Sequence, residues 1–190
     1  MRVATRLLLL LAAVVFVTAP GIVPSAHAAI TAYFASLDGP SESPANASPG
    51  TGFGEVDVDP VAHTLRVQVS FSGLTGTTTA SHIHAPTVVA LTGTAGVATQ
   101  TPYFTGFPIG VTSGTYDHTF DTTLASTYNA TYDGGAPATQ EPALFQAIAD
   151  GKAYLNIHSS TFGGGEIRGF LTLPTPATPM TWGRIKSLYR

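Results

Sequence analysis

The 190-residue chain contains no cysteine. This absence excludes disulfide bonds, thiolate metal ligands, cysteine nucleophiles and a blue-copper centre, whose copper is bound by a cysteine. Charged residues are also scarce, at 10% of the chain. Residues 29–173 hold only three basic side chains, Arg66, Lys152 and Arg168, against eleven acidic ones, which gives a net charge of −8. Because nucleic-acid-binding proteins need a basic surface, we expect no nucleic-acid partner.

The chain also lacks an apolar run long enough to cross a membrane. Its longest run, residues 7–17, is about half of the roughly 20 residues that a membrane span requires. Two arginines lie close before it, and Ala26 and Ala28 fit a cleavage site ahead of Ala29. We therefore interpret residues 1–28 as a signal peptide. The mature chain is expected to be secreted or periplasmic, without a transmembrane span.

Motifs of common enzymes are missing as well. No serine lies in a Gly-x-Ser-x-Gly elbow, and the glycines at 163–165 are not followed by the lysine of a phosphate-binding loop. The sequence therefore predicts no catalytic residues and no organic cofactor site, and it favours a protein that is not an enzyme.

The chain does contain short apolar runs separated by Gly, Pro, Ser and Asp. The clearest is residues 65–71, in which apolar and polar side chains alternate, as in a half-buried strand. We expect six further strands, at residues 30–37, 54–58, 80–84, 115–121, 152–158 and 166–173. This pattern predicts an all-β domain over residues 29–173, an antiparallel Greek-key-like β-sandwich.

Two other segments of this domain can be interpreted. One short helix is expected after Glu141-Pro142, because a proline is tolerated at the first helical position, and Gly151 would end it. The Thr/Gly-rich residues 91–114 are expected to form a loop or a weak hairpin. The aromatic residues of this stretch either anchor it to the core or form a binding lip, and we favour anchoring. They are Tyr103, Phe104 and Phe107.

Three histidines lie in patterns that suit a shared site. His82 and His84 are two residues apart in ASHIHAP, so they share one face of a strand. His158 ends a second expected strand, which a Gly-rich connection joins to the next. Symmetrical pairing of this hairpin would place His158 opposite Glu166, and Asn156 opposite Arg168.

Two interpretations of this cluster remain open. Three histidine ligands with one open coordination position suit zinc or copper, and the three rings should then come within roughly 4 Å of one another. Glu166 would accept the spare ring proton of His158 and fix the orientation of the ring. Alternatively, the same residues form a hydrogen-bonded polar cluster that holds strands together, with Glu166 and Arg168 as a charge pair.

Two further histidines are weaker candidates. His63 follows Asp59-Pro60 in a turn between two expected strands, where we expect it to be solvated. His118 alternates with Tyr116 and Phe120 in an expected strand, so we interpret it as a sheet histidine rather than a ligand.

The order of these motifs resembles the CHRD domain, the module named after chordin. The similar segments lie within residues 30–173 and include Leu37-Asp38-Gly39, Glu42-Ser43-Pro44, LRVQVSFSGL at residues 65–74, Ser81-His82-Ile83-His84, Tyr154-Leu155-Asn156-Ile157-His158 and Gly165-Glu166-Ile167-Arg168-Gly169. The resemblance implies a β-sandwich of exported proteins, acting as a non-enzymatic binding or structural module. Its partner would be an extracytoplasmic protein or a small ligand that the sequence does not identify.

A second similarity supports the alternative of an enzyme. The His-x-His strand looks like the copper-binding strand of Cu,Zn superoxide dismutase, which implies a copper- or zinc-dependent metalloenzyme. A full dismutase site needs more ligands than His82, His84 and His158 provide, so redox turnover is the less favoured function.

The last segment, residues 174–190, differs from the body. Its three prolines favour an extended linker that leaves the sandwich. Beyond them, Trp182, Ile185 and Tyr189 have the spacing of a short amphipathic helix, and the remaining charges are basic. We interpret this tail either as a solvated end or as a segment that contacts the cell envelope.

Overall fold

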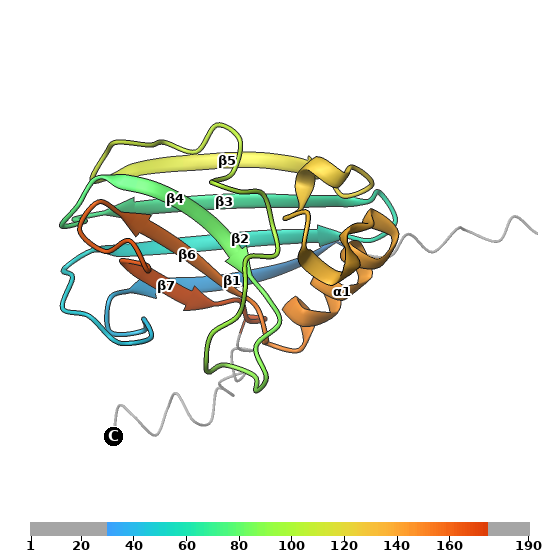
Figure 1. The fold of residues 1–190 in the computed structure, drawn as a ribbon, viewed down its shortest axis with the longest axis horizontal. Helices are drawn as coiled ribbons and strands as arrows, with labels where there is room; N and C mark the ends of the chain where they lie inside the picture. The colour runs from blue at the N-terminus through green and yellow to red at the C-terminus, as the bar shows by residue number, and fades with distance from the viewer. Residues whose placement is uncertain (1–29, 175–190) are drawn as a thin grey trace, which may run out of the picture.

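The computed structural model describes residues 30–174. The predicted signal peptide and nearly all of the predicted tail lie outside these residues. The described part contains seven strands, one α-helix and two short 3-10 helices (Figure 1). They are β1 (Thr31–Asp38), β2 (Thr51–Asp59), β3 (Thr64–Ser72), β4 (Thr78–His84), β5 (Gly114–Asp121), η1 (Ala125–Thr127), η2 (Tyr132–Gly135), α1 (Pro137–Ala149), β6 (Tyr154–Ser159) and β7 (Ile167–Phe170).

The seven strands form one antiparallel sheet in the order β4-β6-β7-β1-β2-β3-β5. The apolar side chains that alternate along β3 are buried, and they align with those of β2, where Val56 is paired with Val67. On the other face Arg66 points outward and pairs with Asp117 of β5 at 2.6 Å. The alternating apolar and polar side chains of β3 therefore lie on the buried and the outer face of this half of the sheet, as expected.

The sheet curls until its two halves face each other (Figure 1). Two glycines of β2 make this close approach possible. A Cβ atom added at Gly54 would lie 2.6 Å from Cδ2 of Leu155, and one at Gly52 would lie 3.3 Å from Cδ1 of Ile167. The all-β antiparallel architecture with one short helix is confirmed. The two layers of the predicted sandwich are halves of one continuous sheet, curled into a half-barrel.

The helix begins earlier than expected. Pro137 occupies its first turn, and the N–H of Gln140 donates to the carbonyl of Ala136 at 2.9 Å, which closes that turn before Pro142. Pro142 therefore lies inside the helix, where its missing N–H removes one hydrogen bond. The helix ends as predicted, because Gly151 adopts a positive φ of 67°. Within residues 30–174, no helix is long and apolar enough to cross a membrane.

The connection from β4 to β5, residues 85–113, runs back along the free edge of β4. The N–H of Ala98 donates to the carbonyl of Ile83 at 2.9 Å, and that of Phe104 donates to Ser81 at 3.2 Å. This connection covers an edge that would otherwise expose unpaired backbone groups.

Aromatic side chains fasten the same connection to the core. Phe104 and Phe107 are buried, at 0% and 4% exposure, whereas Tyr103 is 38% exposed. Phe107 stacks on Phe71 of β3. Anchoring is therefore confirmed for the two phenylalanines, and the backbone that follows β4 is held firmly against the sheet.

Candidate metal centre

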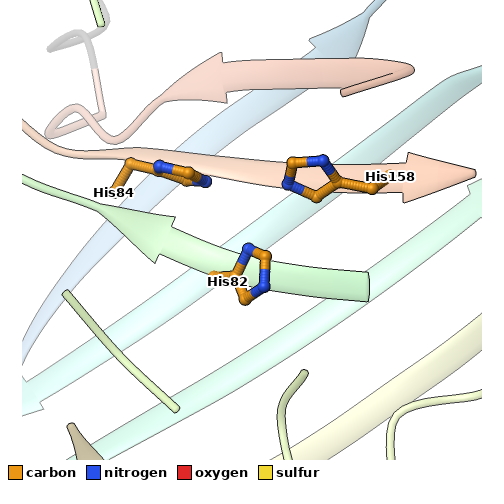
Figure 2. A group of neighbouring side chains, drawn as sticks. All are labelled: His82, His84 and His158. Carbon is orange, nitrogen blue, oxygen red and sulfur yellow. The ribbon is translucent and has the colours of Figure 1, made fainter. Parts of the chain in front are cut away.

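The three predicted histidines converge. His82 and His84 project from β4 and His158 from the neighbouring β6, all on the face opposite the core (Figure 2). One ring nitrogen of each lies within 4.8 Å of those of the other two, slightly wider than the roughly 4 Å expected for a metal site. All three residues are buried, at 6–8% exposure.

Backbone carbonyls fix the proton on each ring. The Nε2 atom of His82 lies 2.8 Å from the oxygen of Pro102, Nδ1 of His84 lies 2.9 Å from that of Ala95, and Nδ1 of His158 lies 3.0 Å from that of Gly163. Because a carbonyl only accepts, each of these nitrogens carries the hydrogen, and the other nitrogen of a neutral ring keeps its lone pair. Those other nitrogens are buried and have no hydrogen-bond partner: Nδ1 of His82, Nε2 of His84 and Nε2 of His158.

The surroundings also keep the rings neutral. Burial, followed by the proximity of His158 and His84, lowers the pKa of His82 to about 4. Burial likewise lowers the pKa of His84 to about 4, with smaller contributions from His158 and Arg168. The pKa of His158 is lowered too, again mainly by burial. Near neutral pH all three rings are therefore ready to donate a lone pair.

Stacking holds one of the rings in place. The His84 ring lies parallel to that of Tyr154, its cross-strand neighbour on β6, with 4.8 Å between the ring centroids. The guanidinium of Arg168 lies 4.8 Å from the centroid of the same Tyr154 ring. The orientation of His84 therefore depends on the side chains of β6 and β7 as well as on its carbonyl partner.

Glu166 does not take the place expected for it beside His158. Its carboxylate accepts hydrogen bonds from the hydroxyl of Ser48 at 2.6 Å, from the N–H of Thr75 and from the N–H of Gly76 at 3.2 Å. The spare ring proton of His158 goes to Gly163 instead. Glu166 is therefore a structural residue that joins two loops, and not the partner that orients His158.

The hairpin explains this difference. Asn156 is paired with Arg168, as predicted, but the paired residues end with Ile157 and Ile167. Gly165, with a φ of 132°, then turns the chain, so the alternation of faces does not continue to Glu166. The predicted pairing of His158 with Glu166 is therefore wrong by one residue, because the ladder ends at Ile157 and Ile167.

The predicted charge pair of Glu166 and Arg168 is also absent. Arg168 lies 3.8 Å from the carboxylate of Glu42, in the β1–β2 connection, and both side chains are buried. Its guanidinium also donates to the carbonyls of Ser41 and, at 3.1 Å, Gly93. The sequence offered only a weak signal for this partner, because Glu42 belongs to a short polar segment far from Arg168 in the chain.

The two weaker histidines lie elsewhere. His63 is in the β2–β3 turn with half of its side chain exposed, but it is not merely solvated, since Nδ1 lies 2.9 Å from the carboxylate of Glu141 on α1. His118 is partly buried in β5, with its ring edge-on to that of Phe120. Its position as a sheet histidine is as expected.

The three imidazole donors of the triad His82, His84 and His158 suit a transition-metal ion that is intermediate between hard and soft. Three neutral imidazoles suit zinc or copper, and no thiolate or carboxylate belongs to the group. Bonds of about 2.0–2.1 Å in a tetrahedral site place ligand nitrogens roughly 3.4 Å apart, so small ring rotations would close the triad around an ion.

Comparison with known proteins places the triad in a family context. The family model described as CHRD domain matches residues 33–171, which include all three histidines. Neither the search of curated proteins nor that of solved structures gave a match.

Proposed function

The chain belongs to the CHRD-domain family, and from this premise we propose that it is an exported, non-enzymatic binding or structural module that holds one zinc or copper ion at the triad. The observation that carries the proposal is the set of three buried ring nitrogens that face one another with free lone pairs. Export rests on the signal-peptide pattern of residues 1–28.

These nitrogens favour a metal site over a purely structural polar cluster. A structural cluster is stabilised when its buried polar atoms are paired, and leaving one unpaired costs roughly 1–3 kcal/mol. Here each ring donates its N–H to a backbone carbonyl. The other ring nitrogen of each histidine keeps its lone pair and has no protein donor within hydrogen-bond distance. A single ion would satisfy all three nitrogens at once.

Shielding of the triad favours a holding function over turnover. The three free nitrogens have almost no contact with solvent, and the loop that supplies Ala95 and Pro102 is fastened along β4. A copper- or zinc-dependent enzyme would need its substrate to reach the open coordination position of the ion. The same shielding suits an ion that is retained.

Metal analysis of the protein tests the proposal. The mature chain, purified without chelators, should contain or take up one equivalent of zinc or copper, measured by elemental analysis and titration. His82→Ala, His84→Ala and His158→Ala should each lower the affinity by at least about 100-fold, because each removes one of three ligands. His118→Ala, on the far strand β5, is the matched control and should bind as the wild type does.

Two results would overturn this assignment. One is a folded wild-type protein that binds neither ion. The other is uptake by the triad variants equal to that of the wild type, which would place the ion elsewhere. Export is tested separately by mass spectrometry of the extracytoplasmic protein, whose first residue should be Ala29.

A further inference from the structure

A buried carboxylate lies apart from the triad and has no complete set of partners. Glu42 is 8% exposed, and its Oε1 atom is shielded from solvent without a hydrogen bond. Its other oxygen, Oε2, lies 3.8 Å from Nε of Arg168, which is longer than a hydrogen bond. A fully ionised carboxylate in this position would be poorly compensated.

A second unpaired oxygen faces the same space. Asn156 is 2% exposed, and its Oδ1 atom also has no partner. A Cβ atom placed on Gly165 would lie 2.6 Å from Oε1 of Glu42, and 2.7 and 2.8 Å from Nδ2 and Oδ1 of Asn156. The carboxylate of Glu42 and the amide of Asn156 therefore both lie against Gly165, where only glycine leaves room for them.

A single proton on Glu42 would give both unpaired oxygens, Oε1 of Glu42 and Oδ1 of Asn156, a hydrogen-bond partner. Two acceptor oxygens cannot hydrogen-bond to each other, but a protonated Glu42 is a donor and Asn156 can accept from it. Burial raises the pKa of Glu42 to about 7, despite the opposing effects of Arg168 and the N–H of Ser43. The neutral acid is thus compatible with near-neutral conditions.

Asn156 connects this acid to the triad. It is paired with His82 on one side and with Arg168 on the other, and it precedes His158 by two residues on the same strand face. Paired residues lie roughly 5 Å apart, so an ion between the histidines would be close to Asn156. The positive charge of the bound ion would add to that of Arg168 and favour the ionised form of Glu42.

We propose that Glu42 carries a buried proton shared with Asn156 and releases it when the triad takes up an ion. The second half of this inference rests on the proposed function. The charged group that faces Glu42 is Arg168 of β7. Asp38 precedes Glu42 by four residues in the chain, and the neutral triad histidines lie on β4 and β6, the strands that carry His82 and Asn156. Asp38 is engaged with the N–H of Ser41.

The first test requires no metal. Infrared spectra of the metal-free protein at pH 5.5 should show the carbonyl band of a buried carboxylic acid. Raising the pH to 9 should abolish this band, and Glu42→Gln should lack it, while Glu55→Gln on the outer face of β2 should retain it. Absence of the band from the wild type at pH 5.5 would overturn the inference, and would instead fit an ionised Glu42 that accepts from a rotated Asn156 amide. The wild-type pH series decides this even if Glu42→Gln fails to fold.

The second test measures protons released during zinc uptake, by calorimetry at pH 6 in buffers of different ionisation enthalpy. The wild type should release close to one proton per ion, and its affinity should fall up to tenfold for each pH unit between 7 and 5. Glu42→Gln should bind zinc without releasing this proton and with little pH dependence, since the triad rings are already neutral. If the wild type and Glu42→Gln release the same number of protons per zinc ion, the proposed coupling between Glu42 and the triad is wrong. If no variant binds metal, the proposed function fails, while the infrared band still decides whether Glu42 holds a proton.

Discussion

Glu166 shows how much a single buried residue can determine in this protein. Its side chain is fully buried and accepts hydrogen bonds from two connections, one through Ser48 and the other through Thr75 and Gly76. Burial by itself would raise the pKa of Glu166, but the hydrogen bonds from Ser159, Ser48, Thr75 and Gly76 together outweigh burial and lower it. The ionised carboxylate therefore ties the β1–β2 and β3–β4 connections to the start of β7.

Replacing this carboxylate tests its role directly. Glu166→Gln should lower the free energy of unfolding by about 2–3 kcal/mol, because a neutral amide weakens charge-assisted bonds and faces a backbone N–H with its own NH₂ group. Urea denaturation measures the loss, with Glu55→Gln, a change at a partly exposed carboxylate on the outer face of β2, as the control. Zinc affinity of the folded variant should stay within twofold of the wild type. A large loss of zinc affinity with an unchanged free energy of unfolding would instead show that Glu166 supports the metal site.

At the scale of elements, the short strand β7 decides whether the triad keeps its shape. It joins β6, which carries His158, to β1 in the other half of the sheet. The approach to β1 is very close: a Cβ atom on Gly169 would lie 2.2 Å from the backbone oxygen of Ser36 and 3.3 Å from Cβ of Ala35. The backbone of β1 cannot move aside without disturbing its own ladder.

Gly169→Ala should therefore separate β7 from β1. We expect a loss of about 3 kcal/mol or more in the free energy of unfolding, as is typical of a clash with backbone atoms inside a packed sheet. Gly164→Ala is a matched control, because nothing lies within 4 Å of its added Cβ atom. Equal stability of the two variants in chemical denaturation would contradict the close packing of β7 on β1.

At the scale of the whole molecule, titration of the buried groups couples the site to folding. His82 and His84 have a pKa of about 4 when folded and an ordinary value of 6.5 when unfolded. Between these values the unfolded chain binds more protons, so stability is present above about pH 6.5 and is lost as the pH falls towards 4. Glu42, with a pKa raised to about 7 from 4.5, acts in the opposite direction: its contribution is present below about pH 4.5 and is lost as the pH rises through 7.

The metal-free protein should therefore become less stable on acidification from pH 6.5 to 5, because three histidines outweigh one carboxyl group. The effect is on the order of 3 kcal/mol for each of His82 and His84 when their titration is complete near pH 4, and His158 acts in the same direction. Denaturation at several pH values measures the slope of stability against pH, which His158→Ala should reduce. A flat wild-type profile over this range would show that the triad is not neutralised by burial.

The boundary of the folded body is a second whole-molecule property. Thr172 exchanges backbone hydrogen bonds of 2.8 and 3.0 Å with Phe34, which fastens the end of the described chain to β1. Deleting residues 174–190 should therefore leave the melting temperature and metal binding unchanged, and should alter how much protein stays with the cell envelope. Calorimetry measures the melting temperature and metal binding, and cell fractionation measures how much protein stays with the envelope. A marked loss of thermal stability would mean that Trp182 and Ile185 pack into the domain.

The sequence by itself determined the features that depend on local periodicity. Side chains alternate between the faces of a strand, so the pattern of β3 was sufficient to predict its buried face, and the spacing of His82 and His84 placed both rings on one face. The same reasoning gave the pairing of Asn156 with Arg168. These predictions succeeded because neighbouring residues alone decide them.

Only the tertiary structure decided which groups the buried polar side chains meet. The partners of the triad are backbone carbonyls, and since every residue has one, the sequence does not distinguish Ala95 or Pro102 from their neighbours. Glu42 takes the place beside Arg168 that was expected for Glu166, because a turn at Gly165 interrupts the alternation and because Glu42 reaches Arg168 from far along the chain. A buried polar atom is satisfied by whatever donor the completed fold brings within reach, and that depends on long-range packing.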